Sequence, residues 1–149
     1  MRLVLGLLIG VLASSSAHAE EMVPLDSIMQ GNPEESYKFI RCAAFYKANA
    51  DWAGEAVDQA DVDQQMKAVV ALLVVGTDIR SKKTGENFES VFEVVQQDAT
   101  AMLQLYGENY RQSYALRGAA WDGNPLWESD AATCKILGEV ALNITAGME

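Results

Sequence analysis

The residues with the most sharply defined chemistry are the two cysteines, Cys42 and Cys134, which are the only ones in the chain. Each follows a Gly-Asn-Pro triplet at the same distance, with Gly31 ahead of Cys42 and Gly123 ahead of Cys134. Asn is favoured at helix N-caps and Pro at the first helical position, so both triplets predict a helix start. Each cysteine then falls in the third turn of its helix. Its neighbours at helical spacing are mostly apolar, so we expect both thiols to face the core.

The N-terminal residues indicate the compartment in which those thiols reside. Residues 1–19 have a positively charged start, an apolar stretch too short to span a bilayer and a small-residue cleavage site. We therefore expect a cleaved signal peptide at 1–19 and a single periplasmic domain at 20–149, soluble and without stable membrane insertion. In an oxidising compartment an even cysteine count predicts a disulfide, here Cys42–Cys134, joining the first and last helices.

Other side chains offer little for catalysis or for cofactor binding. The only histidine, His18, lies in the predicted signal, so the mature chain has no imidazole for a catalytic triad, a zinc site or haem ligation. We expect neither a metal nor another cofactor. Asp58, Asp61 and Asp63 resemble a calcium loop only loosely, and acids at the start of a helix explain them better.

Glutamates are the only acid-base groups left for an enzyme. Glu-Ser pairs occur at Glu35, Glu89 and Glu128, and they leave open a Glu-dependent cell-wall hydrolase. The chain has no other set of residues typical of a catalytic site, so we expect that it is not an enzyme.

The charge of the chain favours particular partners. Without Arg2 the mature chain has ten Lys and Arg against 21 Asp and Glu, a net charge of −11. Such a chain would be repelled by nucleic acid and by anionic lipid. We expect its partner to be another envelope or secreted protein, possibly a basic one.

One aromatic series is typical of a protein-binding surface. Tyrosines four residues apart fall near one helix face, and Tyr, Trp and Arg are enriched where proteins bind partners. Two tryptophans flank the turn that follows, where they could contact a ligand or cover the end of the bundle. The candidate binding residues are Tyr106, Tyr110, Tyr114, Arg117, Trp121 and Trp127.

Periodicity predicts the elements that position these residues. The apolar spacing indicates an all-α bundle of about four main helices. A short turn near 25–29 precedes them, a connection lies at 51–61 and a polar loop at 81–86. The predicted helices span 33–50, 62–80, 87–116 and 125–146. The middle of the second, AVVALLVVG, is apolar all round, so it is either a central buried helix or a strand, and its length favours a helix.

These features favour a non-enzymatic protein-binding module of the inhibitor, immunity or adaptor type. The main alternative is a carrier that encloses an apolar small molecule between helices. Its pocket walls would be Met66, Met102, Phe88 and Phe92, which equally suit an ordinary core.

Overall fold

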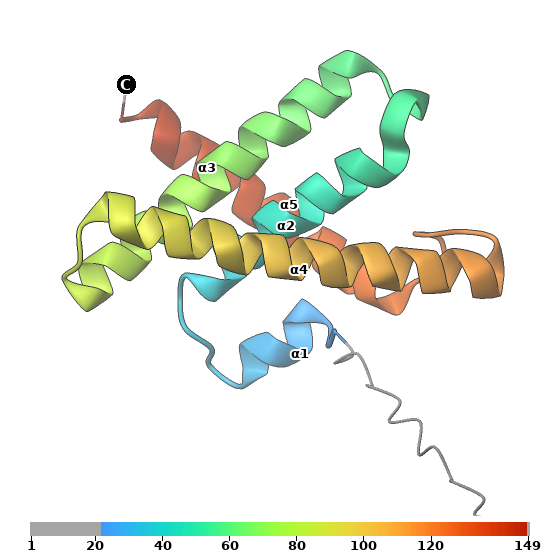
Figure 1. The fold of residues 1–149 in the computed structure, drawn as a ribbon, viewed down its shortest axis with the longest axis horizontal. Coiled ribbons are helices and arrows are strands. Elements are labelled where there is room, and N and C mark those ends of the chain that lie inside the picture. The colour runs from blue at the N-terminus through green and yellow to red at the C-terminus, as the bar shows by residue number, and fades with distance from the viewer. Residues whose placement is uncertain (1–21, 149) are drawn as a thin grey trace, which may run out of the picture.

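A computed structural model describes residues 22–148, apart from the side chain at position 55, so the predicted signal at 1–19 lies outside the described residues. Within 22–148 the chain forms five α-helices and one 3-10 turn, without strands (Figure 1). The predicted all-α bundle with four long helices is confirmed, and the expected turn near 25–29 is the short first helix. The elements are α1 (Leu25–Gln30), α2 (Tyr37–Ala53), η1 (Gly54–Ala56), α3 (Gln59–Thr84), α4 (Phe88–Arg117) and α5 (Pro125–Ala146).

Side-chain caps fix the starts of the last three helices. The Asn124 side chain accepts hydrogen bonds from the backbone N–H groups of Leu126 and Trp127, so α5 begins at Pro125, as predicted. Asn87 caps α4 in the same way, and Asp58 caps α3. The capping role confirms that the acids around Asp58 serve the start of this helix.

The interpretation of the first Gly-Asn-Pro triplet as a helix start is wrong. The N–H of Gly31 donates to the carbonyl of Ile28 and ends α1, and Asn32 follows with a left-handed φ of 52°. Gly and Asn are the residues that most readily adopt such turns after a helix. Because α2 begins only at Tyr37, Cys42 lies in its second turn rather than its third.

The predicted loop at 81–86 is also wrong for its first four residues, which extend α3 to Thr84. The helix ends at Gly85, whose φ of 75° is left-handed and whose N–H donates to the carbonyl of Ser81. Lys82 and Lys83 lie in the last turn, where positive charge is favourable beside the free carbonyls. The polar sequence therefore forms the end of a helix instead of a turn.

Helices α2 and α3 form the centre of the bundle, because they pack against each other and each also packs against α4 and α5. Helix α4 crosses in front of α2 and α3 (Figure 1), and α5 also packs against α2 and α1. Gly76 allows α3 to approach α2 closely, since a Cβ there would lie 3.1 Å from the Ile40 side chain. The buried residues of α3, including Leu72 and Val75, confirm that AVVALLVVG is a helix largely enclosed by the bundle.

The predicted disulfide is confirmed. Cys42 on α2 and Cys134 on α5 are bonded, with their Cα atoms 5.1 Å apart and both residues fully buried. Within residues 22–148, no helix combines the length and the apolarity needed to cross a membrane.

We predict that replacing both cysteines, Cys42→Ala with Cys134→Ala, lowers the free energy of unfolding by about 4 to 5 kcal/mol. The bridge joins residues 92 apart, and loop-closure entropy gives a loop of that length this value. Urea denaturation of the two proteins measures the difference. Wild-type protein unfolded with reductant serves as the control, and a loss below about 1 kcal/mol in both experiments would contradict the prediction.

Candidate functional site

The predicted aromatic series does not lie on one surface. Tyr106 and Tyr110 are fully buried, and the Tyr106 ring packs edge-on against Phe45 of α2. Tyr114 is 57% exposed and Arg117 is exposed as well. The first two tyrosines therefore belong to the core. Of the predicted series on α4, a partner could reach only Tyr114 and Arg117.

The two tryptophans pack at the end of the bundle. The rings of Trp121 and Trp127 are stacked with their centroids 6.1 Å apart, and both residues are half-buried. The Trp127 indole N–H donates to the Asn49 side-chain oxygen over 3.0 Å, and the Tyr110 hydroxyl donates to the same oxygen. Asn49 thus joins α2, α4 and α5 at the end of the bundle where the indoles lie.

A buried ion pair that the sequence analysis missed lies beside the disulfide. Arg41 and Asp130 are both fully buried, and the Arg41 guanidinium donates to Asp130 Oδ2 from Nη2 at 2.7 Å and from Nε at 2.9 Å. The Tyr106 hydroxyl also donates to Asp130. The only sequence signal is a charged residue next to Cys42 in an otherwise apolar stretch, FIRCAAF.

The same pair holds the N-terminal segment against the bundle. Arg41 Nη2 donates to the Val23 carbonyl over 2.6 Å, and the Leu25 N–H donates to Asp130 Oδ1 over 2.8 Å. The Leu25 side chain is fully buried. With its polar atoms satisfied and no access to solvent, this cluster positions α1, α2, α4 and α5 instead of offering a catalytic site.

Burial changes the acid-base behaviour of the tyrosines in this region. Removal from water, followed by the nearby charge of Asp130, raises the pKa of both Tyr106 and Tyr110 well above the ordinary value. Burial by itself lowers the pKa of the Arg41 guanidinium, but Tyr106, Asp130 and Tyr37 raise it by more, so the pKa is raised overall. The native protein therefore keeps both tyrosines neutral and the arginine charged.

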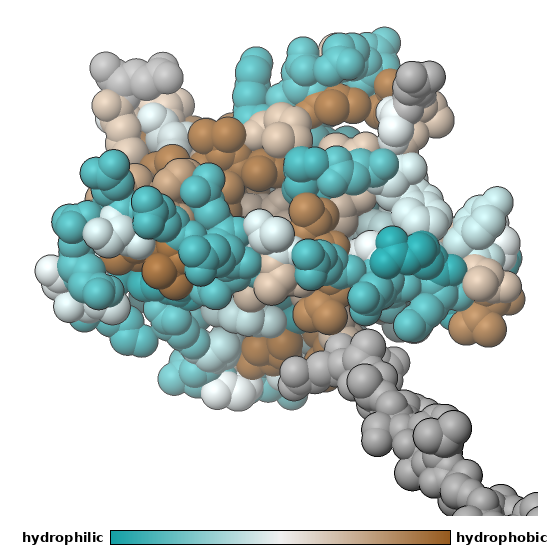
Figure 2. Space-filling model, viewed as in Figure 1, coloured by the Kyte–Doolittle hydropathy of each residue, from teal (hydrophilic) through white to brown (hydrophobic). Residues whose placement is uncertain are grey.

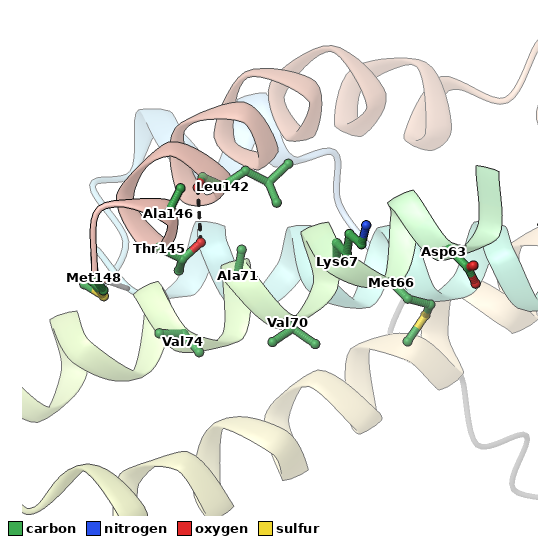
Figure 3. A pocket seen from close by; sticks show the side chains of 10 residues that line it. All are labelled: Asp63, Met66, Lys67, Val70, Ala71, Val74, Leu142, Thr145, Ala146 and Met148. Atoms are coloured by element: carbon green, nitrogen blue, oxygen red, sulfur yellow. Dashed lines mark hydrogen bonds between the residues drawn. The ribbon is translucent and has the colours of Figure 1, made fainter. Parts of the chain in front are cut away.

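An apolar groove of about 860 Å³ lies between α3 and α5 (Figure 3). In the space-filling view, hydrophobic side chains gather where α3 passes the end of α5 (Figure 2). The groove residues stay open to solvent, with Val70 59% and Met148 61% exposed. The lining consists of Asp63, Met66, Lys67, Val70, Ala71, Val74, Leu142, Thr145, Ala146 and Met148.

Few polar groups in the groove remain free to bind a ligand. The Thr145 hydroxyl donates to the carbonyls of Ala141 and Leu142 in its own helix. Asp63 and Lys67 carry the only charges in the lining. An apolar segment that filled the groove would therefore leave few polar groups without hydrogen bonds.

A second, more polar hollow lies on another side of α3 and adjoins the groove at Leu142, which lines both. It includes Asp61 and Glu139 as well as Lys135. The Gln65 side-chain oxygen in its lining is buried and has no hydrogen-bond partner among the described residues. An apolar groove and a more charged hollow thus lie beside each other.

The four residues predicted as walls of a carrier pocket lie in different places. Met66 lines the groove, whereas Phe88 and Phe92 stack on each other at the start of α4, with centroids 6.0 Å apart. Met102 packs against a small cluster of Ile40, Val91 and Val95.

Comparison of the chain with protein-family models, with curated proteins and with solved structures finds no match. The geometry described above is therefore the basis on which its function is argued.

We predict that Arg41→Met lowers the free energy of unfolding by about 3 to 5 kcal/mol, because it leaves the Asp130 carboxylate buried without a counter-charge. The double change Arg41→Met with Asp130→Asn should restore part of this loss, since the amide is neutral and still accepts a hydrogen bond from Leu25. Urea denaturation measures stability, and hydrogen exchange at the Leu25 amide reports the docking of α1. A double variant less stable than Arg41→Met would contradict this account.

We also predict that stability falls as the pH rises above about 10, the ordinary pKa of tyrosine. Unfolded tyrosines ionise there while Tyr106 and Tyr110 stay neutral in the native state, so the unfolded state binds fewer protons. Each of the two should contribute a slope of about 0.7 kcal/mol per pH unit at pH 10, which rises toward about 1.4 at higher pH. Tyr106→Phe and Tyr110→Phe should each remove one such contribution in denaturation curves between about pH 10 and 11. Phe45→Leu is the control, because it should lower stability without changing the slope.

Proposed function

We propose that this protein is a non-enzymatic, protein-binding module, exported to the periplasm, that holds a basic amphipathic helix of a partner protein in the groove between α3 and α5. The observation that carries the proposal is the uncovered apolar side of α3. Its central stretch is apolar all round, and three helices cover most of it, but Met66, Val70 and Val74 line an open groove. An amphipathic helix is the usual occupant of such a groove.

The framework behind the groove is suited to rigid binding. The disulfide and the Arg41–Asp130 pair fix α5 on α2, and α3 packs against both helices. Binding to a preformed surface avoids the entropy cost of ordering it. A disulfide is consistent with an oxidising compartment, which together with the signal-like residues 1–19 supports export.

The charge of the molecule favours a basic occupant. The full chain has a net charge of −10. Asp63 lines the groove, and Asp61 and Glu139 line the polar hollow beside it. The two lysines there, Lys67 and Lys135, are fewer than the acids. Attraction of this kind accelerates association and selects against acidic partners.

The other two functions gain less support. A carrier surrounds most of its ligand, whereas this groove is open along its length and Val70 and Met148 remain largely exposed. For a hydrolase, Glu35, Glu89 and Glu128 are all exposed and belong to three separate parts of the chain.

We predict that a synthetic helical peptide of Leu and Lys, with Leu on one face, binds the groove. Methyl resonances of Met66 and Met148 should then shift in NMR spectra of methionine-labelled protein, because both residues line the groove. The Met102 methyl, on α4, should change little. Val70→Glu should weaken binding by at least about tenfold, and added salt should also weaken it.

Two controls test the site and the sign of the charge. Leu116→Glu makes the same kind of change at a residue on α4 that is 80% exposed, and it should leave peptide binding intact. A peptide of Leu and Glu with the same pattern should bind much more weakly. Equal binding of the two peptides, or shifts centred on Met102, would refute the proposal.

A further inference from the structure

A second apolar feature lies on a different side of α5. Ile136, Val140 and Ile144 are 64%, 41% and 41% exposed, and their spacing of four residues aligns them in one row along the helix. Three large β-branched side chains in a row on a solvent-facing helix surface are unusual unless something covers them. None of the three residues lines the groove or the polar hollow beside it.

Within α5, the residues nearest to this row on the same side are uncharged. The exposed or half-exposed residues that share its side of α5 include Thr133 and Asn143. At 100° per residue, the charged pair Lys135 and Glu139 lies toward α3, where both residues line the polar hollow. A molecule with a net charge of −10 repels a second copy of itself, so an uncharged side of α5 is a more favourable place for two copies to meet than an acidic one.

We propose that this row forms the contact of a symmetric homodimer, in which α5 packs antiparallel against α5 of a second copy with Val140 on the two-fold axis. The row reads the same in both directions, Ile-Val-Ile. Antiparallel packing centred on Val140 therefore places Ile136 against Ile144 of the second copy, and Ile144 against Ile136. Such a self-complementary contact is what a two-fold interface requires.

The position of α1 is compatible with this register. Helix α1 contacts α5 near its start, where Asp130 accepts from the Leu25 N–H and the Ser129 hydroxyl donates to Asp26. Ser129 lies two turns before Ile136, on the same side of α5. In the proposed register residues 129 and 130 face a point beyond Ala146 of the second copy, where its α5 has ended. These two contacts therefore lie outside the α5–α5 contact itself.

The test is sedimentation equilibrium of the disulfide-bonded protein from about 1 µM to about 500 µM. We expect a monomer–dimer equilibrium that shifts toward the dimer at high salt, because salt screens the repulsion between two acidic molecules. Ile136→Lys and Ile144→Glu should each weaken the dimer by at least about tenfold. The double variant should regain it, because antiparallel packing pairs each lysine with a glutamate of the other copy.

Matched variants separate this contact from the groove. Val140→Glu should abolish the dimer, since it places two carboxylates together at the axis, whereas Leu116→Glu and Val70→Glu should leave it unchanged. A wild-type protein that stays monomeric in high salt would overturn the proposal. So would a folded double variant that fails to regain the dimer, or loss of the dimer in Val70→Glu.

Discussion

The crossing of α2 and α5 is the constraint on which the rest of the structure depends. A disulfide and an ion pair lie next to each other at this crossing. Arg41 and Cys42 are adjacent on α2, and their partners, Asp130 and Cys134, lie one turn apart on α5. The ion pair extends this junction to α4 through Tyr106, and to the segment before α1 through Val23. A buried pair of charges adds little stability by itself, but it imposes strict geometry on the groups that satisfy it. One junction therefore sets the positions of four helices.

The groove follows from how α3 is accommodated in this arrangement. The central stretch of α3 is apolar on all sides and needs neighbouring helices all around it, and α3 packs against three helices. On its remaining side Val70 is exposed to solvent, next to Leu142 of α5 and to Met148, which follows that helix. Burying those side chains would contribute roughly 25 cal/mol for each square ångström of apolar surface removed from water. A partner that covered this surface would therefore gain free energy of binding from apolar side chains that the fold leaves uncovered.

The sequence predicted the long helices and the disulfide well because both depend on local or compositional signals. Apolar spacing defined the helices, the Asn124 cap defined the start of α5, and the even number of cysteines after a predicted signal peptide indicated the bond. The misinterpreted Gly31-Asn32 shows the limit, since the same residues that cap a new helix also end the previous one. Tertiary pairing was harder: nothing local to Arg41 identifies Asp130, 89 positions away, as its partner. Likewise, the spacing of the tyrosines indicates a common face but not whether that face is covered.

Helix α5 shows how one element can serve the fold and two surfaces at once. Its core side holds Asp130 and Cys134, its side toward α3 contributes Leu142 and Thr145 to the groove, and the row centred on Val140 faces outward. The exposed charges Lys135 and Glu139 lie on the groove side and not in the outer row. Because these sides are separated around the helix, occupation of one does not obstruct the other. Ionic strength would affect them in opposite directions, since a molecule with a net charge of −10 attracts a basic helix while two such molecules repel each other. Salt dependence is therefore the physical property that distinguishes the two surfaces of this helix.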